Sequence, residues 1–407
     1  MQPHSYDVVI IGAGPAGTAA AIELRDCSLT VALIDKATFP RDKVCGDALS
    51  VDVVRQLRKL SPDLAKSLAD LPFKTRSGGV RIIAPSGEFI DIPFASQQSE
   101  KGYVCRREDF DMLMLTEARK GSNITVLEGC EVTDIRHLID HLHLETSQGG
   151  ITAKMLIAAD GAHSVVKRKL ISSAIDRSYH SAGLRAYHTG LHGFNDENFI
   201  ELYFIRDILP GYLWMFPLPG DSANVGIGML TSAVSAKRVN LRKTFHHLLT
   251  THPAISHRIA KANAIESPVG HGLPLGGKIQ PMSGRRFLLT GDAASLIDPF
   301  SGEGIGNAIR SGRFAAKQVI ESFGINDFSV NAMRRYDKKM YEMLRSEFKV
   351  SYAMLKLSQY PWVLNTIVRK ANRNNELLQT LIDALAFPDK KRWLVNPMFY
   401  INLLFRS

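Results

Sequence analysis

A glycine-rich segment near the N-terminus limits the possible folds of this chain more than any other feature. Residues 7–11 read Asp-Val-Val-Ile-Ile, and residues 12–17 read Gly-Ala-Gly-Pro-Ala-Gly. A continuous β-branched run of this kind is typical of a buried parallel strand. Residues 18–25 then have a helical composition, and residues 30–35 form a second apolar strand that ends in Asp35. This order of strand, glycine turn, helix, strand and acid predicts a parallel βαβ unit.

The residue types in this unit fit the binding of a dinucleotide. Gly12 allows a tight turn, Gly14 lets a pyrophosphate approach the backbone, and Gly17 lets the helix pack against the strand. The N-terminus of the helix presents free N–H groups and a partial positive charge to the phosphates. Asp35 can accept hydrogen bonds from ribose hydroxyls. We therefore predict a Rossmann-type domain, and this unit alone fits FAD and NAD equally.

Two later segments repeat the pattern of an apolar strand that ends at an acid. Residues 156–161 read Leu-Ile-Ala-Ala-Asp-Gly, and residues 286–292 read Arg-Phe-Leu-Leu-Thr-Gly-Asp. A loop with the sequence Pro-Phe-Ser-Gly-Glu-Gly-Ile-Gly follows at residues 299–306 and opens into a helix. Its glycine spacing differs from that of residues 12–17, and no acid suited to a ribose follows it. A second dinucleotide-binding domain is therefore not expected.

Together, the three separated motifs resemble the p-hydroxybenzoate hydroxylase superfamily of FAD-dependent oxidoreductases. The resemblance implies that Asp292 holds the ribityl chain of FAD and that the amides of Gly304 and Ile305 lie near the flavin ring. A helix N-terminus there can stabilise negative charge on the reduced flavin. The resemblance also implies that Arg107, in an Arg-x-x-Phe-Asp helix start, contacts FAD and that Val132 lies on the strand beside the adenine.

Two further motifs narrow the resemblance to one family. Residues 40–47 read Pro-Arg-Asp-Lys-Val-Cys-Gly-Asp, and residues 210–217 read Pro-Gly-Tyr-Leu-Trp-Met-Phe-Pro. Both resemble the geranylgeranyl reductase family, whose members reduce isolated carbon–carbon double bonds in isoprenoid chains. In that family the matching cysteine lies beside the flavin, so the resemblance implies that Cys45 is catalytic and donates or relays a proton. The alternative is that Cys45 is a small buried hydrophobic residue.

The predicted site therefore has a cofactor part and a substrate part. In the substrate part, Tyr212, Trp214 and Phe216 alternate, so that their side chains share one face of a strand. The resemblance implies that this face is a wall of an apolar substrate channel, and ordinary packing in the core of a sheet is the alternative. The predicted cofactor-binding residues are Gly12, Gly14, Ala16, Gly17, Asp35, Lys36, Cys45, Gly46, Arg107, Val132, Asp160, Gly291, Asp292, Gly304 and Ile305.

The expected fold class is α/β, with a Rossmann-type FAD-binding domain, an inserted antiparallel-sheet substrate domain and a helical C-terminal segment. The FAD-binding domain is expected to be discontinuous and the substrate domain to be built from two inserts. A hairpin is predicted at residues 79–84 and 88–92, with further strands at 198–205, 212–216 and 223–229. The expected ranges are 1–75, 100–180 and 275–330 for the FAD-binding domain, 76–99 and 181–274 for the substrate domain, and 331–407 for the helical region.

Composition and charge limit the partners and the location. The net charge is +10, but no signature of nucleic-acid binding accompanies it, so we do not expect a nucleic-acid partner. The 4 cysteines form no CxxC pair, which indicates neither a metal site nor a disulfide framework and favours the cytoplasm. The C-terminal region combines basic and aromatic residues at 390–393 and 398–405. This mixture suits peripheral contact with the inner face of a membrane, and it suits packing over the substrate domain equally well.

The favoured function is an FAD-dependent oxidoreductase that reduces carbon–carbon double bonds of an isoprenoid or other lipid-like substrate. A flavin-dependent monooxygenase that hydroxylates an aromatic or polyketide ring is the first alternative, and a membrane-associated flavoprotein without activity is another. A halogenase is less favoured, because Tyr212 and Phe216 replace the first Trp and the Ile of the halogenase motif Trp-x-Trp-x-Ile-Pro. NAD(P)H and ferredoxin both stay open as electron donors, and the sequence does not define an oligomeric state.

Overall fold

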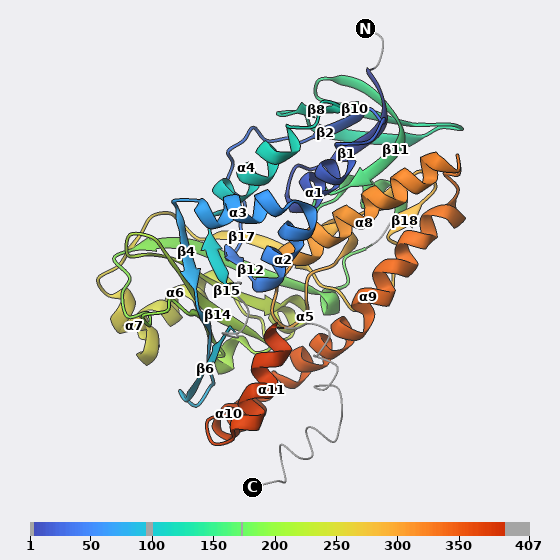
Figure 1. Ribbon diagram of the computed structural model, residues 1–407. Coiled ribbons are helices and arrows are strands. Elements are labelled where there is room, and N and C mark those ends of the chain that lie inside the picture. The colour runs from blue at the N-terminus through green and yellow to red at the C-terminus, as the bar shows by residue number, and fades with distance from the viewer. Residues whose placement is uncertain (1–3, 95–100, 172–173, 387–407) are drawn as a thin grey trace.

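The computed structural model describes residues 4–94, 101–171 and 174–386, and within them the chain has an α/β architecture with two large sheets (Figure 1). The first sheet combines segments that are far apart in the sequence. Its central strands pair in parallel in the order β19, β11, β1, β2 and β8. The strands of this sheet are β1 (His4–Ile11), β2 (Val31–Ile34), β8 (Ile124–Leu127), β9 (Val132–His137), β10 (Leu142–Thr146), β11 (Gly149–Ala158), β18 (Ser283–Gly284) and β19 (Phe287–Leu289).

The predicted Rossmann-type sheet is confirmed, and its strand order brings the sequence motifs together. The glycine turn follows β1, Asp35 follows β2, Asp160 follows β11 and Asp292 follows β19. Because the carboxyl ends of parallel strands meet at one edge of a sheet, these motifs converge although they are up to 280 residues apart.

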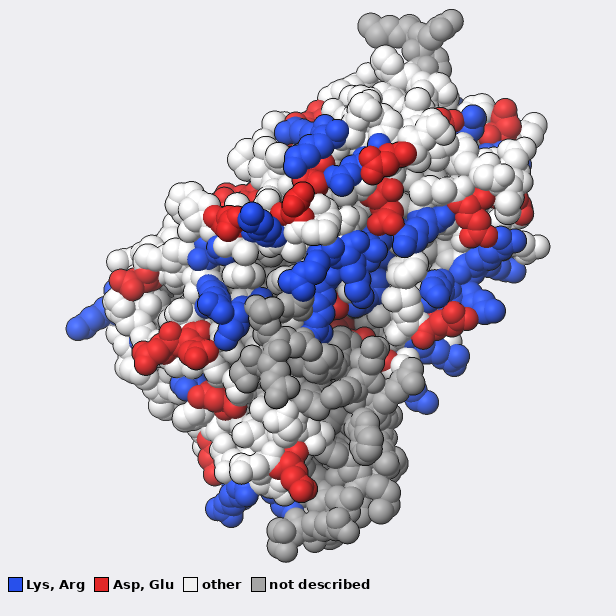
Figure 2. Space-filling view, viewed as in Figure 1, with Lys and Arg blue, Asp and Glu red and all other residues white. Residues whose placement is uncertain are grey.

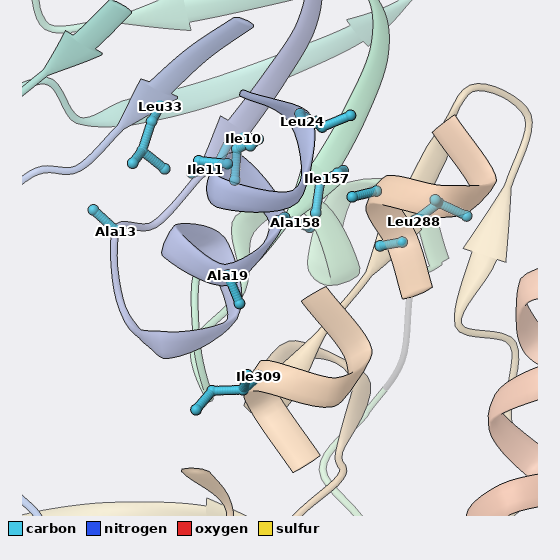
Figure 3. Close-up of a cluster of buried hydrophobic side chains, with 14 of the residues drawn as sticks. Ile10, Ile11, Ala13, Ala19, Leu24, Leu33, Ile157, Ala158, Leu288 and Ile309 are labelled. Carbon is cyan, nitrogen blue, oxygen red and sulfur yellow. The ribbon is translucent and has the colours of Figure 1, made fainter. Parts of the chain in front are cut away.

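Helices α1 (Pro15–Leu24) and α8 (Ile305–Gly324) pack together beside this sheet and contribute to its core. Figure 3 shows α1 beside buried Ile10 and α8 beside buried Leu288 of the sheet. A Cβ on Gly312 would overlap the carbonyl oxygen of Ala16, so the two helices approach backbone to backbone. Helix α1 begins at residue 15 rather than at the predicted residue 18, because proline is well suited to the first turn of a helix.

The second large sheet contains the predicted hairpin and all three further predicted strands, which are confirmed. Its pairs are antiparallel except that β13 runs parallel to β5, which joins the early hairpin to the later strands. The sheet is therefore mixed at this one junction. Its strands are β5 (Gly79–Ile83), β6 (Phe89–Pro93), β12 (His180–Thr189), β13 (Ile200–Tyr203), β14 (Gly211–Leu218), β15 (Ser222–Leu230), β16 (Asn263–Ala264) and β17 (Val269–Pro274).

A small third sheet and several helices connect and flank the two large sheets (Figure 1). The small sheet consists of β3 (Ala48–Leu49), β4 (Lys74–Ser77) and β7 (Gly102–Cys105). The helices that come before the last part of the chain are α2 (Val51–Leu60), α3 (Pro62–Asp70), α4 (Arg107–Ala118), α5 (Thr231–Ala236), α6 (Leu241–Thr251) and α7 (Pro253–Ile259).

The last part of the chain is helical, as predicted, with α9 (Val330–Leu357), α10 (Pro361–Ala371) and α11 (Asn375–Ala386). Leu364 of α10 packs in a cluster with Phe204 and Leu209, so this helix covers part of the second sheet. The basic and aromatic segments at 390–393 and 398–405 lie outside the described residues. Among the helices that are described, none combines the length and the apolar character needed to cross a membrane.

Candidate active site

A cavity of about 740 Å³ is lined by residues of both large sheets, and its size is typical of a cofactor or ligand site. Every predicted site residue except Gly17 lines this cavity. Gly17 lies beneath the turn instead, where a Cβ would overlap the carbonyl oxygen of Gly12, so it permits close packing of α1 on β1. The residues brought together are Gly12, Gly14, Ala16, Asp35, Lys36, Cys45, Gly46, Arg107, Val132, Asp160, Tyr212, Trp214, Phe216, Gly291, Asp292, Gly304 and Ile305.

Two arginines face the N-terminus of α1. A Cβ on Gly14, the residue that precedes the helix, would lie 3.8 Å from a terminal nitrogen of Arg41 and 4.0 Å from one of Arg107. Buried Asp111 accepts hydrogen bonds of 2.8 Å from both guanidinium groups and fixes their direction. Burial disfavours the charged form of Arg107, but the charges and hydrogen bonds of Asp111 and Cys45 together outweigh this effect and raise its pKa. The space above Gly14 therefore suits a pyrophosphate, which the helix N-terminus also attracts.

The acid at the end of β2 is held by backbone groups. Asp35 accepts hydrogen bonds from the backbone N–H groups of Ala13, at 2.7 Å, and Ala37, at 2.9 Å. Each of its oxygens has a further lone pair for a ribose hydroxyl. Asp160 differs, because one of its oxygens accepts from the N–H groups of Val165 and Val166 in its own loop. Burial raises the pKa of Asp160, and the assignment of this residue to cofactor binding stays a prediction.

The other end of the cavity contains the Gly-Asp motif and the N-terminus of α8. A Cβ on Gly304, the residue before α8, would lie 3.6 Å from Oδ1 of Asp292. Gly291 has φ +55° and its N–H donates to Ser311 Oγ at 2.9 Å, which ties this turn to α8. A helix N-terminus and a carboxylate thus lie side by side where the flavin end of FAD is expected. These residues, the two arginines and Asp35 fit FAD along the whole cavity.

The loop that carries Cys45 is held from below by buried polar groups. Cys45 Sγ accepts a hydrogen bond of 3.3 Å from the backbone N–H of Asp47 and also hydrogen-bonds with Arg107. Asp47 has φ 66° and is fully buried, and its Oδ2 accepts from Tyr187 Oη at 2.7 Å and from Asn224 Nδ2 at 2.8 Å. Its Oδ1 has no hydrogen-bond partner among the described residues. Burial raises the pKa of Asp47 to about 6.

Because the pKa of Asp47 is raised from 3.8 to about 6 on folding, the folded state binds this proton more tightly than the unfolded state. Its contribution to stability is therefore present below pH 3.8 and is lost as the pH rises through about 6. Between pH 3.8 and about 6, we expect the free energy of unfolding of the wild type to fall by about 3 kcal/mol relative to that of Asp47→Asn, whose side chain does not titrate. The measurement is the melting temperature of both proteins against pH. Parallel curves would mean that Asp47 titrates normally.

The aromatic residues of β14 form a continuous row along the cavity. The ring centroids of Tyr212 and Trp214 are 6.3 Å apart, and those of Trp214 and Phe216 are 6.2 Å apart. Phe204 extends the row, with its ring 5.7 Å from that of Tyr212 and 5.9 Å from that of Phe300. The hydroxyl of Tyr212 donates to the backbone oxygen of Ser301 in the loop before α8. The predicted wall thus contacts the predicted flavin site.

The indole of Trp214 lies over the neighbouring strand β15, because that strand carries glycine at the facing positions. A Cβ on Gly226 would overlap the Trp214 ring, and one on Gly228 would lie 3.6 Å from it. On the other side, a Cβ on Gly46 would lie 2.8 Å from the ring of Phe216. Phe216 therefore supports the loop of Cys45 from beneath, whereas Tyr212 and Trp214 present larger surfaces to the cavity.

Sequence reasoning missed several polar residues of the cavity. Arg41 and Lys43 line the cavity and lie in the same motif as Cys45, at residues 40–47. That motif could have identified both residues from the sequence. Lys43 Nζ lies 2.9 Å from Nε2 of His271, and burial lowers the pKa of both groups, that of His271 to about 4. His271 lines the cavity, whereas Asn224 is buried beneath the loop of Cys45. Neither residue carries a local signal, because only the sheet brings them here. Among the described residues, no cluster of three His, Cys, Asp or Glu side chains can hold a metal ion.

The parallel sheet, the residues that fit a pyrophosphate and a ribose, and the apolar wall define a Rossmann-type FAD-dependent oxidoreductase. Comparison with known proteins then gives the family. Residues 6–170 match the pyridine nucleotide-disulphide oxidoreductase family, and residues 181–270 match the geranylgeranyl reductase catalytic domain. The chain belongs to the geranylgeranyl reductase family.

Individual relatives agree with this assignment. A menaquinone reductase of Mycobacterium tuberculosis is 32% identical over 322 residues, which cover 77% of this chain and 76% of the relative. A digeranylgeranylglycerophospholipid reductase of Methanococcus aeolicus is 30% identical over 375 residues, or 87% and 88% of the two chains. The structure of a geranylgeranyl bacteriochlorophyll reductase-like protein from Thermoplasma acidophilum has a TM-score of 0.81, at 25% identity over 96% and 98% of the chains. A halogenase solved with FAD has a TM-score of 0.74 at 18% identity, which shows a shared fold.

Proposed function

We propose that this enzyme reduces isolated carbon–carbon double bonds in the isoprenoid chain of a lipid. One observation carries the proposal: the thiol of Cys45 and the aromatic row of β14 line one cavity together with the residues that fit FAD. An isolated double bond is a poor hydride acceptor, so its reduction needs a proton donor in a dry site. Once bound and reduced by the electron donor, FAD would supply the hydride for one alkene carbon.

The residues of the chain supply orientation and the proton. Tyr212 and Trp214 hold an apolar chain along β14 and exclude water from it. Cys45 gives its thiol proton to the second alkene carbon, and the N–H of Asp47 stabilises the thiolate that remains. Lys43 lies on the same loop and favours the same thiolate by its positive charge.

The substrate class follows from the wall and is supported by the relatives. Three large aromatic side chains in one row suit a long and apolar chain better than a small polar ring. The names of the two curated relatives specify a menaquinone and a digeranylgeranylglycerophospholipid as the compounds those proteins reduce. Both are lipids with isoprenoid chains, so we propose an isoprenoid lipid for this enzyme as well.

We further propose that the electron donor and the membrane surface are recognised by positive charge. Figure 2 shows Lys and Arg side chains gathered across the middle of one face, where Figure 1 places α2, α8 and α9. Nicotinamide dinucleotides, ferredoxins and anionic lipid surfaces all carry negative charge. Rapid anaerobic reduction of the bound flavin by NADPH, NADH and reduced ferredoxin, each tested alone, identifies the donor. Because anionic lipids would attract the same positive charge, we propose a peripheral location at the inner face of the membrane.

Anaerobic turnover tests the proposed function against the monooxygenase alternative. The chemically reduced holoenzyme is mixed with geranylgeraniol, and the flavin absorbance and the product mass are followed. We expect the flavin to reoxidise as the product gains two hydrogens, with no need for oxygen. Oxygen consumption coupled to hydroxylation of a small aromatic compound, without reaction of the prenyl chain, would show that the enzyme is a monooxygenase.

A further inference from the structure

Asn224 is a fully buried residue of β15 that lies between the aromatic row and the loop of Cys45. We propose that Asn224 is a positioning residue that sets the direction of the Cys45 thiol and links it to Trp214 at the substrate wall. This inference rests on the proposed function, because it assigns the link to the proton-transfer step. Neither the sequence motifs nor the family resemblance marks this residue.

Three hydrogen bonds use the side-chain amide of Asn224 in one orientation. Its Oδ1 accepts from Nε1 of Trp214 at 2.8 Å, and its Nδ2 donates to the backbone oxygen of Cys45 and to Oδ2 of Asp47, both at 2.8 Å. An indole N–H can only donate and a backbone carbonyl can only accept. The amide therefore has a single orientation that satisfies all three partners, and neither aspartate nor leucine can replace it.

The bond to Asp47 matters because of the backbone of that residue. Asp47 has φ 66°, a left-handed conformation that is unfavourable for residues other than glycine. Its side chain is anchored by Asn224 on β15 and by Tyr187 on β12. In this conformation the backbone N–H of Asp47 donates to Cys45 Sγ at 3.3 Å. The two anchors thus maintain the strained turn that directs a hydrogen-bond donor at the thiol.

The anchor on β12 is itself held by charged groups. Arg185 is fully buried, lies 4.1 Å from the ring centroid of Tyr187, and forms ion pairs with Asp42 and Glu266. Arg106 lies over the same ring at 4.5 Å. Tyr187 is therefore held by two cation–π contacts as well as by its hydrogen bond to Asp47.

A complete chain of contacts runs from the substrate wall to the thiol. It passes from the Trp214 indole to the Asn224 amide, then to Asp47, and from the Asp47 N–H to Cys45. The titratable and charged groups that face its end are Tyr187 and Arg185 on β12, Arg107 on α4 and Lys43 on the loop. Within this chain of contacts, Asn224 hydrogen-bonds both to the wall and to the loop.

The test measures Cys45 directly in the holoenzyme, in a Cys27→Ser background that removes the other half-buried thiol. The rate of iodoacetamide alkylation of Cys45 is recorded against pH by mass spectrometry, with and without Asn224→Ala. Without Asn224, the Asp47 N–H is expected to turn away from the thiol. Loss of this hydrogen bond to the thiolate should raise the midpoint of the curve by about one pH unit. Reoxidation of the reduced flavin by geranylgeraniol should slow about tenfold, while flavin content and the rate of flavin reduction stay unchanged.

Two variants separate positioning from general damage. Trp214→Phe keeps an aromatic ring but removes the N–H, and it should shift the alkylation curve in the same direction by less. Val225→Ala is a matched control. Val225 follows Asn224 in the sequence and is equally buried, but its side chain packs in the core on the other face of β15. It should leave the alkylation curve in place.

An unchanged alkylation curve in Asn224→Ala would overturn the proposal, as would an equal shift in Val225→Ala. If Asn224→Ala does not fold, Asp47→Gly gives the same test, because glycine tolerates φ 66° but lacks the anchored side chain. Failure of geranylgeraniol to oxidise the wild-type flavin would instead reject the proposed function. The alkylation curve does not depend on substrate, so the two failures are distinguishable.

Discussion

Replacing Gly12 by alanine is expected to yield a protein without bound FAD. Gly12 has φ +98°, and a Cβ there would overlap the carbonyl oxygen of Ala159 and lie 2.7 Å from its carbon. The left-handed backbone and the overlap together should reduce the free energy of FAD binding by about 3 kcal/mol, which corresponds to roughly hundredfold weaker binding of FAD. The strain falls on the binding site itself, because the turn after β1 and the end of β11 both line the cavity. Flavin absorbance of the purified protein and titration of the apoprotein with FAD measure the loss.

Gly149→Ala is the matched control for this substitution. Gly149 has φ +115°, but a Cβ there meets nothing within 4 Å, and the residue does not line the cavity. This variant should carry the backbone strain and still bind FAD at the wild-type level. A Gly12→Ala protein with wild-type flavin content would mean that the turn is not the dinucleotide site.

Cys45→Ser is expected to slow alkene reduction by roughly 10²- to 10⁴-fold, the range of general acid catalysis. A serine hydroxyl holds its proton far more tightly than a thiol, but it can keep the hydrogen bond from the Asp47 N–H. Flavin content and flavin reduction should therefore stay the same, and only reoxidation by geranylgeraniol should slow. Stopped-flow measurement of the two half-reactions separates these steps.

The control for this prediction is Cys27→Ser. Cys27 is also half-buried, but its thiol donates to the carbonyl of Leu24 at 2.9 Å and lies outside the cavity lining. It should leave both half-reactions unchanged. An equal loss in both half-reactions of Cys45→Ser would instead indicate that Cys45 supports the flavin site structurally.

The parts of the site that the sequence could predict are those with local chemistry. Gly12, Asp35 and Asp292 each sit at the end of an apolar strand, so the strand order of a parallel sheet was enough to bring them together. Tyr212 and Trp214 could be placed on one face because a strand repeats every two residues. Each of these inferences needs only a short segment and a known periodicity.

The polar residues beneath Cys45 could not be predicted in the same way. Asn224 contacts Cys45 and Asp47 across 179 and 177 residues of sequence, and His271 contacts Lys43 across 228. An asparagine within a strand is more often read as a weak strand former than as a site residue. Its role depends on the register of β14 and β15, which pairs Phe216 with Asn224, and no short pattern encodes that register.

The close approach of α1 and α8 has a consequence for synthesis on the ribosome. Ala16 belongs to the first helix to be made, but its carbonyl is covered by Gly312, nearly 300 residues later. Strand β19, which pairs with β11, is likewise absent until residue 289 has emerged. At about 5–20 residues per second, the nascent glycine turn therefore waits roughly 15 seconds or more without its partners. Strand β11 is complete at residue 158 and β19 only at residue 289, so the apolar edge of β11 stays open for roughly 7 seconds or more at the same rate. During that time the nascent chain is a client for chaperones that hold exposed strands.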